Sequence, residues 1–268
     1  MLTEVGIAAG THLVPVVCGA IVGFSLALTG GGGSTLAVPL LLYVVGVQDV
    51  HLAIGTSALA VSVNSYANLV PHARAGNVRW RPGILFTVAG IVGALFASEL
   101  GKLVDGQALI GLFAGLMVVV AVMMFRRRHA PPQPVGCKPI EHLNARLLGT
   151  GFAAGCIAGF FGVGGGFLIV PGLMLAARME MVHAIGTSLF GVGSFGLATA
   201  LNYARSGLVD WQLAAAFILG GVGGGWLGAL SCHHLSRKRG ALNVVFSAMI
   251  MAVAIYMLIR TLRPLVNI

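Results

Sequence analysis

Two glycine-rich turns carry the residues of this chain that are best suited to chemistry. They consist of Gly32, Gly33 and Ser34 in the first copy and of Gly164, Gly165 and Gly166 in the second. Each turn stands directly before an apolar run with the length of a helix. Glycine permits unusual backbone angles there, and the following helix offers free N–H groups at the positive end of its dipole. The turns are therefore candidate anion-binding sites, although close helix packing by glycine remains the alternative.

Hydroxyl side chains follow each turn at matching distances, and amide side chains lie downstream of them in both copies. The hydroxyl pairs are Thr56 with Ser57 and Thr187 with Ser188, and the amides are Asn64, Asn68 and Asn202. Such groups in apolar surroundings need partners or a wet cavity, so we expect them to contact a polar substrate. A hydroxyl in a membrane helix often bonds its own backbone, and this alternative stays open for each residue taken singly.

Two histidines and two arginines also occupy matched positions. His51 and His183 begin the segments that carry the hydroxyls, and Arg74 and Arg205 end them. The histidines are candidates for capping, or for proton coupling or anion contact. The arginines are candidates for ordinary loop charges, or for attracting an anion to both mouths of a pathway.

These matches belong to an internal repeat that relates residues 30–80 to residues 162–211. The offset is 132 as far as the matched histidines and then 131 as far as Trp80 and Trp211. Val38-Pro39 returns as Val170-Pro171, and the prolines are expected to interrupt the helices that follow the turns. The glycine turns are therefore part of a duplicated unit.

The composition places this unit in a membrane. Hydrophobic residues make up 57% of the 268 residues, charged residues 9%, and the mean hydropathy is +0.96. Too few polar side chains exist to cover a water-soluble globule. We expect an all-α polytopic protein whose ten apolar segments are approximately 12–29, 35–47, 51–71, 82–100, 106–125, 146–161, 167–178, 182–204, 211–231 and 241–262.

The segments divide into three regions along the chain. Residues 1–126 form a first membrane repeat, residues 127–145 a basic linker with four prolines, and residues 146–268 a second repeat. About five segments per repeat is an odd number, so the second copy is expected to be inverted. The second segment of each half is short, and the first two segments could instead form a re-entrant hairpin, which leaves the number odd.

The basic residues predict the orientation. With the linker cytoplasmic, twelve basic residues fall on the cytoplasmic side and four on the other side, a strong positive-inside bias. Both termini are then outside. The net charge of +9 lies in short loops and not in an interleaved basic and aromatic surface, so nucleic acid is not expected as a partner.

Enzymatic chemistry is not expected. The sequence lacks a nucleophile-and-base pattern, paired carboxylates and the spacing of an ATP-binding motif, and its four cysteines form no CxxC pair. The cluster Cys232-His233-His234 is more typical of a helix end than of a metal site, so neither metal nor cofactor is predicted. Acidic residues are nearly absent from the spans, which argues against a cation pump.

The doubled sequence closely resembles the TauE/SafE family of membrane proteins, described as sulfite exporters or anion permeases. The residues that carry the resemblance run from Gly162 to Pro171 and from His183 to Ser188, together with their first-half counterparts through Ser57. The resemblance implies a transporter of the bacterial inner membrane for sulfite, thiosulfate or sulfonates, usually outward. The first copy departs from the second with Gly31 in place of Val163 and Ser34 in place of Gly166, so the half-sites are expected to contribute unequally.

The sequence therefore predicts a secondary transporter that works by alternating access, with a central anion site at the glycine turns and the hydroxyls. Membrane lipid and a small anion are the expected partners, and proton or ion coupling is open. A channel of the same topology and a non-transporting assembly factor are the alternatives.

Overall fold

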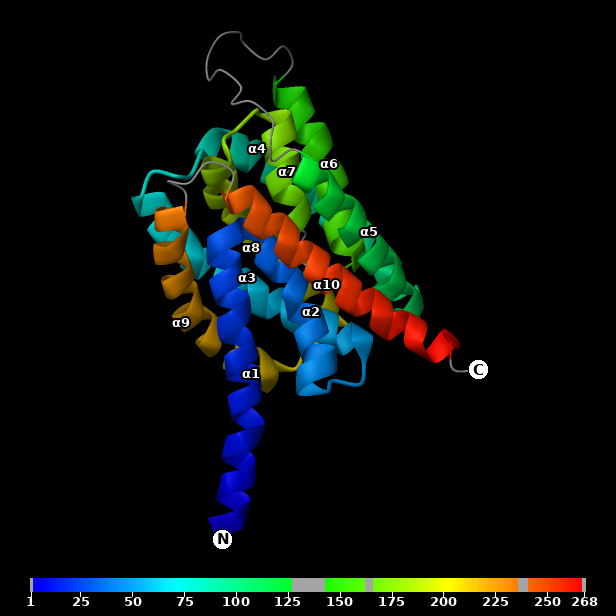
Figure 1. Cartoon of the computed structure of the whole chain (residues 1–268). Helices are drawn as coiled ribbons and strands as arrows, with labels where there is room; N and C mark the ends of the chain where they lie inside the picture. Colours follow the sequence, from blue (N-terminus) through cyan, green and yellow to red (C-terminus); the bar gives the residue numbers. More distant parts are fainter. Residues whose placement is uncertain (1, 127–142, 162–165, 236–240, 267–268) are drawn as a thin grey trace.

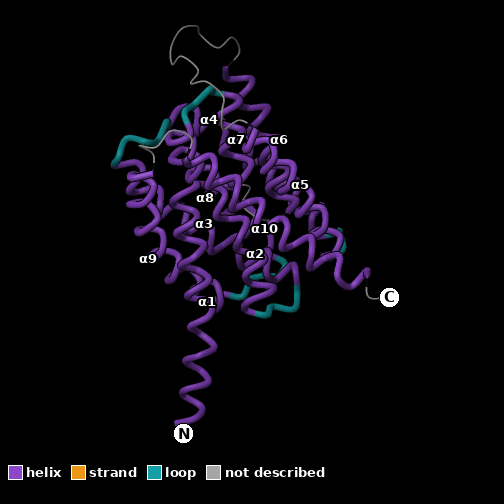
Figure 2. The backbone as a smooth tube through the Cα atoms, in the orientation of Figure 1, coloured by secondary structure: helices purple, strands orange, loops and turns teal. Residues whose placement is uncertain are grey.

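The computed structural model describes residues 2–126, 143–161, 166–235 and 241–266, and these form helices joined by short loops (Figures 1 and 2). No strand occurs among these residues, so the all-helical prediction is confirmed. The elements are α1 (Leu2–Thr29), η1 (Gly30–Leu36), α2 (Ala37–Leu40), η2 (Leu41–Val45), α3 (Val50–Arg74), α4 (Trp80–Lys102), α5 (Gly106–Arg126), α6 (Leu143–Phe161), α7 (Gly166–Ala176), α8 (Met181–Arg205), α9 (Trp211–Leu235) and α10 (Ala241–Val266).

The observed helices follow the ten expected segments closely. The largest difference in length is at α1, which begins at Leu2, whereas the apolar run begins near residue 12. α6 begins at Leu143, so the last three residues of the expected linker are helical. In the first half the short second segment is divided into η1, α2 and η2, whereas in the second half its counterpart is the single helix α7.

Three helices are long and apolar enough to cross a bilayer by length and composition, in the part of the chain that the structure describes. They are α4, α8 and the stretch Trp211–Ser231 of α9. Shorter apolar stretches lie in α1, α5 and α10 and at Gly33–Val45. α3 is as long as α8 but carries serine, asparagine and histidine along its length, which lowers its hydropathy.

Glycines join the two halves through two helix pairs, α1 with α9 and α4 with α6. A Cβ atom on Gly23 of α1 would overlap the carbonyl of Gly221, and a Cβ atom on Gly155 of α6 would overlap the carbonyl of Gly90. Helix backbones approach closely in this way only where no side chain intervenes. Each half therefore packs its first helix against the fourth helix of the other half.

The centre of the molecule is the crossing of α3 and α8. Ser62 Oγ donates to the Gly193 carbonyl at 2.6 Å, and the hydroxyls of Tyr66 and Ser194 are 2.9 Å apart. α8 is the most enclosed of the three long apolar helices, with 78% of its apolar window buried against 44% for α4 and 39% for α9. Most lipid contact is therefore left to helices outside this crossing.

The outer surface is apolar. Leucine, valine and phenylalanine side chains on α1, α4, α5 and α9 are exposed, and Trp80 and Trp211 lie exposed at the starts of α4 and α9. A water-soluble protein rarely exposes so much contiguous apolar surface, whereas a bilayer would cover it. The chain is a multi-pass membrane protein, and the tryptophans stand where interfacial anchors are usual.

Candidate functional site

The first glycine turn is a short 3-10 segment, η1. Gly30 follows the end of α1 and has a φ of 67°, in the left-handed region that glycine adopts without strain. Ser34 is fully buried, and its Oγ donates to the carbonyl of Gly31 at 2.7 Å. Pro39 lies in α2, and the helix continues as the π-helical segment η2, so the element after the turn is irregular as its proline predicts.

The second glycine turn is described only at its end. Gly164 and Gly165 lie outside the described residues, and Gly166 begins α7, which contains Pro171. Gly166 and Pro171 are both buried. The N-terminus of α7 therefore starts inside the protein.

The two turns meet. A Cβ atom on Gly31 would overlap the carbonyl of Gly166, and Gly30 packs against Ile185 and the Ser188 hydroxyl of α8. The residues in contact thus come from η1, α7 and α8. Of the predicted site residues that are described, this contact brings together Gly166 and Ser188, with Ser34 bonded to the turn itself.

The serine hydroxyls predicted to contact substrate are bonded to their own helices. Ser57 Oγ donates to the Ile54 carbonyl at 2.9 Å, and Ser188 Oγ donates to the Ile185 carbonyl at 2.8 Å. With its proton used in this way, a serine retains only acceptor capacity toward a ligand. For these two serines the local-bonding alternative describes the geometry.

The threonine hydroxyls instead connect the two halves. Thr187 Oγ1 accepts a hydrogen bond from the backbone N–H of Arg79, just before α4, at 2.9 Å. Thr56 Oγ1 accepts one from the N–H of Asp210, just before α9, also at 2.9 Å. These matched bonds satisfy a backbone donor at a helix start and leave each threonine O–H available to donate.

The asparagines of α3 face α1 and α9 and not the glycine turns. Asn68 Nδ2 donates to the Gly23 carbonyl at 3.3 Å, and its side chain lies against Gly225. Asn64 lies against Gly221, is fully buried, and has no hydrogen-bond partner for either amide atom among the described residues.

His72 extends this row, and the sequence interpretation missed it. Its Nε2 lies 3.0 Å from the Ala27 carbonyl of α1, and the side chain is 3% exposed. The available signal was spacing, because residues 64, 68 and 72 share one face of a helix. We call Asn64, Asn68 and His72 the polar column of α3.

Asn202 lies at the opposite end of α8 from the linker-side loops. Its Nδ2 donates to Glu99 Oε1 at 2.7 Å and to Ser98 Oγ at 3.0 Å, and Glu99 forms an ion pair with Lys102 at 2.9 Å. Arg205 ends the same helix and is exposed. The structure therefore places this predicted substrate contact in a charged end region, apart from the glycine turns.

The matched histidines lie at helix starts. His51 follows Asp49, whose carboxylate accepts from the backbone N–H of His51 at 2.8 Å. His183 Nε2 lies 3.3 Å from an Arg79 guanidinium nitrogen, and its Nδ1 lies 3.8 Å from Glu180. His183 and Arg79 also line a pocket of about 640 Å³, whereas Arg74 is exposed at the end of α3.

Metal-ligating side chains do not gather in this region. Within the described ranges, no group of three or more histidine, cysteine, aspartate or glutamate side chains is close enough to hold a metal ion. The side chains of the Cys232-His233-His234 cluster are not described. The groups at the glycine contact are backbone amides and hydroxyls, which can bind an anion by hydrogen bonds without a metal ion.

Comparison of the sequence with known proteins assigns this chain to a family. Residues 15–257 match the family described as sulfite exporter TauE/SafE. A probable membrane transporter protein of Xylella fastidiosa (strain Temecula1) is 50% identical over 254 residues, which cover 95% of this chain and 97% of the relative. The probable membrane transporter protein YdhB of Bacillus subtilis is 28% identical over 81% of this chain and 87% of its own length. The probable membrane transporter protein MJ0441 of Methanocaldococcus jannaschii is 26% identical over 91% of this chain and 94% of its own. No solved structure gives a significant match.

Proposed function

The chain belongs to the TauE/SafE family and is a membrane transporter, and from that premise we propose that it is a secondary transporter of small sulfur-containing anions. The substrate class is sulfite, thiosulfate or sulfonates, and net transport is outward. The description of the matched family as sulfite exporters supports both. The anion is bound at the glycine turns by backbone N–H groups, which supply positive potential without a buried charge.

The observation that carries this proposal is the contact between the two turns. Gly31 and Gly166 approach so closely that neither accommodates a Cβ atom, and Ser188 lies against Gly30. Two helix starts from different halves thus meet inside the protein, which is how several transporter folds assemble a substrate site. The turns are packed against one another here, so an anion between them requires the halves to separate.

The separation is proposed to be a rocking of two inverted repeats. The matched helices α3 and α8 run in opposite directions where they cross. Gly55 near the start of α3 lies against Tyr203 near the end of α8. The bonds of Thr56 and Thr187 repeat in the same relation. These paired contacts support a pseudo-two-fold axis between the two halves. In alternating access, the two halves exchange conformations across this axis.

The orientation is proposed from charge. The linker and the starts of α4 and α6 face the cytoplasm, and both termini face the outside of the inner membrane. His183 and Arg79 then lie at the cytoplasmic mouth, whereas His51 and Arg205 lie at the outer mouth. At these positions the two histidines are proposed to contact the anion as it enters and leaves, or to couple its transport to proton movement.

Anion transport by purified protein in lipid vesicles tests the proposal. Counterflow of labelled sulfite is measured against thiosulfate, sulfate, sulfonates and carboxylates, since an exchange of this kind distinguishes a carrier from a channel. Gly31→Ala should abolish counterflow, because its methyl group overlaps Gly166. Gly115→Ala on α5 is the matched control, since that methyl group meets open space.

The outcomes separate the alternatives. Counterflow that is equal in the Gly31→Ala and Gly115→Ala proteins at equal reconstituted amounts would refute the site. Conductive flux without counterflow would favour a channel. No flux of any tested anion, together with co-purification of a partner protein, would favour an assembly factor.

A further inference from the structure

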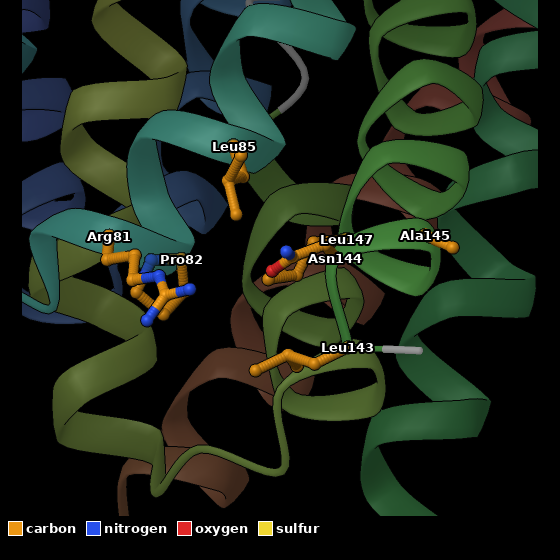
Figure 3. Close-up of a pocket in the computed structure, with 7 residues that line it drawn as sticks. All are labelled: Arg81, Pro82, Leu85, Leu143, Asn144, Ala145 and Leu147. Carbon is orange, nitrogen blue, oxygen red and sulfur yellow. The ribbon is translucent and has the colours of Figure 1, made fainter. Parts of the chain in front are cut away.

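Two adjoining pockets occupy the linker-side ends of α4 and α6, away from the glycine contact. The larger is about 640 Å³ and is bounded by the residues before α4, by Leu143 and by the loop between α7 and α8. The smaller is about 510 Å³ and lies between α4 and α6 (Figure 3). Arg81, Pro82 and Leu143 line both pockets, so the two form one continuous depression.

The larger pocket is positively charged. Three arginines, Arg79, Arg81 and Arg178, face one carboxylate, that of Glu180. The Arg79 guanidinium lies 3.3 Å from His183 Nε2, and the Glu180 carboxylate lies 3.8 Å from Nδ1 of the same histidine. Arg81 and Arg178 are exposed and have no ion-pair partner among the described residues. Two guanidinium groups are therefore available to an anion.

The smaller pocket is a slot that continues from these charges, and its lining is mixed: Pro82, Leu85, Leu143, Ala145 and Leu147 are apolar, and Arg81 and Asn144 are polar. Figure 3 shows Arg81 and Pro82 of α4 on one side and Leu143 and Leu147 of α6 on the other. Farther along the helices, the glycine contacts of α4 and α6 close the space, because Gly151 lies against the Phe86 carbonyl. The slot thus opens where the two helices separate, at the end nearest the arginines.

The surroundings place this depression at a membrane interface. Trp80 is 50% exposed beside the pocket, and its ring packs edge-on against Phe190 at 6.0 Å between centroids. Ile84 and Val88 of α4 and Leu148 of α6 are exposed apolar side chains farther from the arginines. A basic cavity beside a tryptophan, above an apolar helix surface, has the chemistry of an anionic lipid site.

We infer that this depression binds an anionic phospholipid, with the phosphate between Arg81 and Arg178 and the start of an acyl chain in the slot between α4 and α6. A small inorganic anion would use the charges and leave the slot empty, whereas a phospholipid fills both. A guanidinium pairs with phosphate through two parallel hydrogen bonds, which favours arginine over a simple point charge. The inference does not depend on which anion is transported.

Lipid titration of the purified full-length protein tests this inference. Binding of phosphatidylglycerol is measured by native mass spectrometry and by the shift in melting temperature, with phosphatidylcholine as the neutral lipid. The double variant Arg81→Ala/Arg178→Ala should weaken phosphatidylglycerol binding about 25-fold, since each surface arginine contributes roughly fivefold. Arg126→Ala is the matched control, because Arg126 is an exposed arginine at the linker-side end of α5 that lines neither pocket.

Two further arms identify the source of the phosphate. Glycerol phosphate, which has the charge without the chains, should bind far more weakly than the lipid, and Leu143→Ser should weaken lipid binding without changing glycerol phosphate binding. Arg81→Lys/Arg178→Lys should retain part of the affinity, because it keeps both charges and loses only the paired guanidinium hydrogen bonds. The melting temperature of the alanine protein without lipid shows whether that protein is folded. Equal binding of glycerol phosphate and lipid would overturn the inference in favour of a soluble-anion mouth. Equal losses in the double variant and in Arg126→Ala would overturn it in favour of non-specific surface charge.

Discussion

The central helices α3 and α8 occupy matched places in the two halves but carry side chains of different chemical types at matched positions. On α3 the polar column of Asn64, Asn68 and His72 faces α1 and α9. The matched positions of α8 hold Phe195, Thr199 and Tyr203, and Phe195 lies against Gly90 and stacks on Phe86 at 6.3 Å between centroids. The matched positions thus carry two amides and an imidazole on α3, and two aromatic rings and a hydroxyl on α8.

The contrast is sharpest between Asn64 and its counterpart Phe195, where an amide stands against an apolar ring. The Phe195 ring is buried among apolar side chains at no polar cost, whereas the Thr199 and Tyr203 hydroxyls of α8 are buried without a hydrogen-bond partner among the described residues. Buried amides without partners are unfavourable, and Asn64 has none among the described residues. Because an apolar side chain would serve packing better at this position, Asn64 is a better candidate than Phe195 for a role in transport.

The largest expected effect is the loss of an aromatic ring from α8. Phe195→Ala removes a fully buried side chain and leaves a cavity beside Phe86, so we expect a loss of about 3–5 kcal/mol of unfolding free energy. Thermal unfolding in detergent measures it. The control is Phe96→Ala, since Phe96 is 68% exposed on the lipid-facing side of α4 and should change stability little. Similar losses in both proteins would show that the α8 ring is not a packing centre.

A substitution at the matched position of α3 should raise the unfolding free energy instead of lowering it. Asn64→Leu keeps a similar volume and removes two unpartnered amide atoms, so we expect a gain of roughly 1–3 kcal/mol in stability. We also expect anion counterflow to fall, because the polar column is altered. Val63→Leu, at a lipid-exposed neighbour, controls for added apolar volume. A destabilised Asn64→Leu protein with normal counterflow would contradict both parts of the comparison.

A smaller effect is expected where the halves are alike. Thr56→Val and Thr187→Val each remove the acceptor for one backbone N–H at a helix start, of Asp210 and Arg79 respectively. We expect each to lower stability by about 1 kcal/mol. Thermal unfolding of the two single variants and of the double variant measures the effects. Clearly unequal losses would show that the two bonds are not equivalent, whatever their matched geometry.

Much of the fold could be read from the sequence because apolar runs and duplicated motifs are local signals. The ten helical stretches follow from hydropathy, and the meeting of the two glycine turns follows from the repeat. The division of residues 30–45 into three short elements did not follow, because proline marks an interruption without specifying its form.

The site was harder to predict because side-chain direction depends on neighbours. Ser57 and Thr56 are adjacent hydroxyls, yet one bonds its own helix and the other bonds the loop before α9. Asn202 was grouped with the substrate contacts by type, but Glu99 is its partner, and only tertiary structure brings residues 99 and 202 together. His72 was missed because it lacks a matched histidine in the second half.

The most direct test of the account is whether a transported anion protects the glycine contact. Ser188→Cys, in a protein whose four native cysteines are replaced by alanine, places one thiol beside Gly30. Its rate of reaction with a small membrane-impermeant thiol reagent is measured in vesicles, from each side, with and without saturating sulfite or thiosulfate. The account predicts reaction from both sides and a lower rate with the transported anion present. A rate that no transported anion changes would contradict the claim that the two glycine turns form the substrate site.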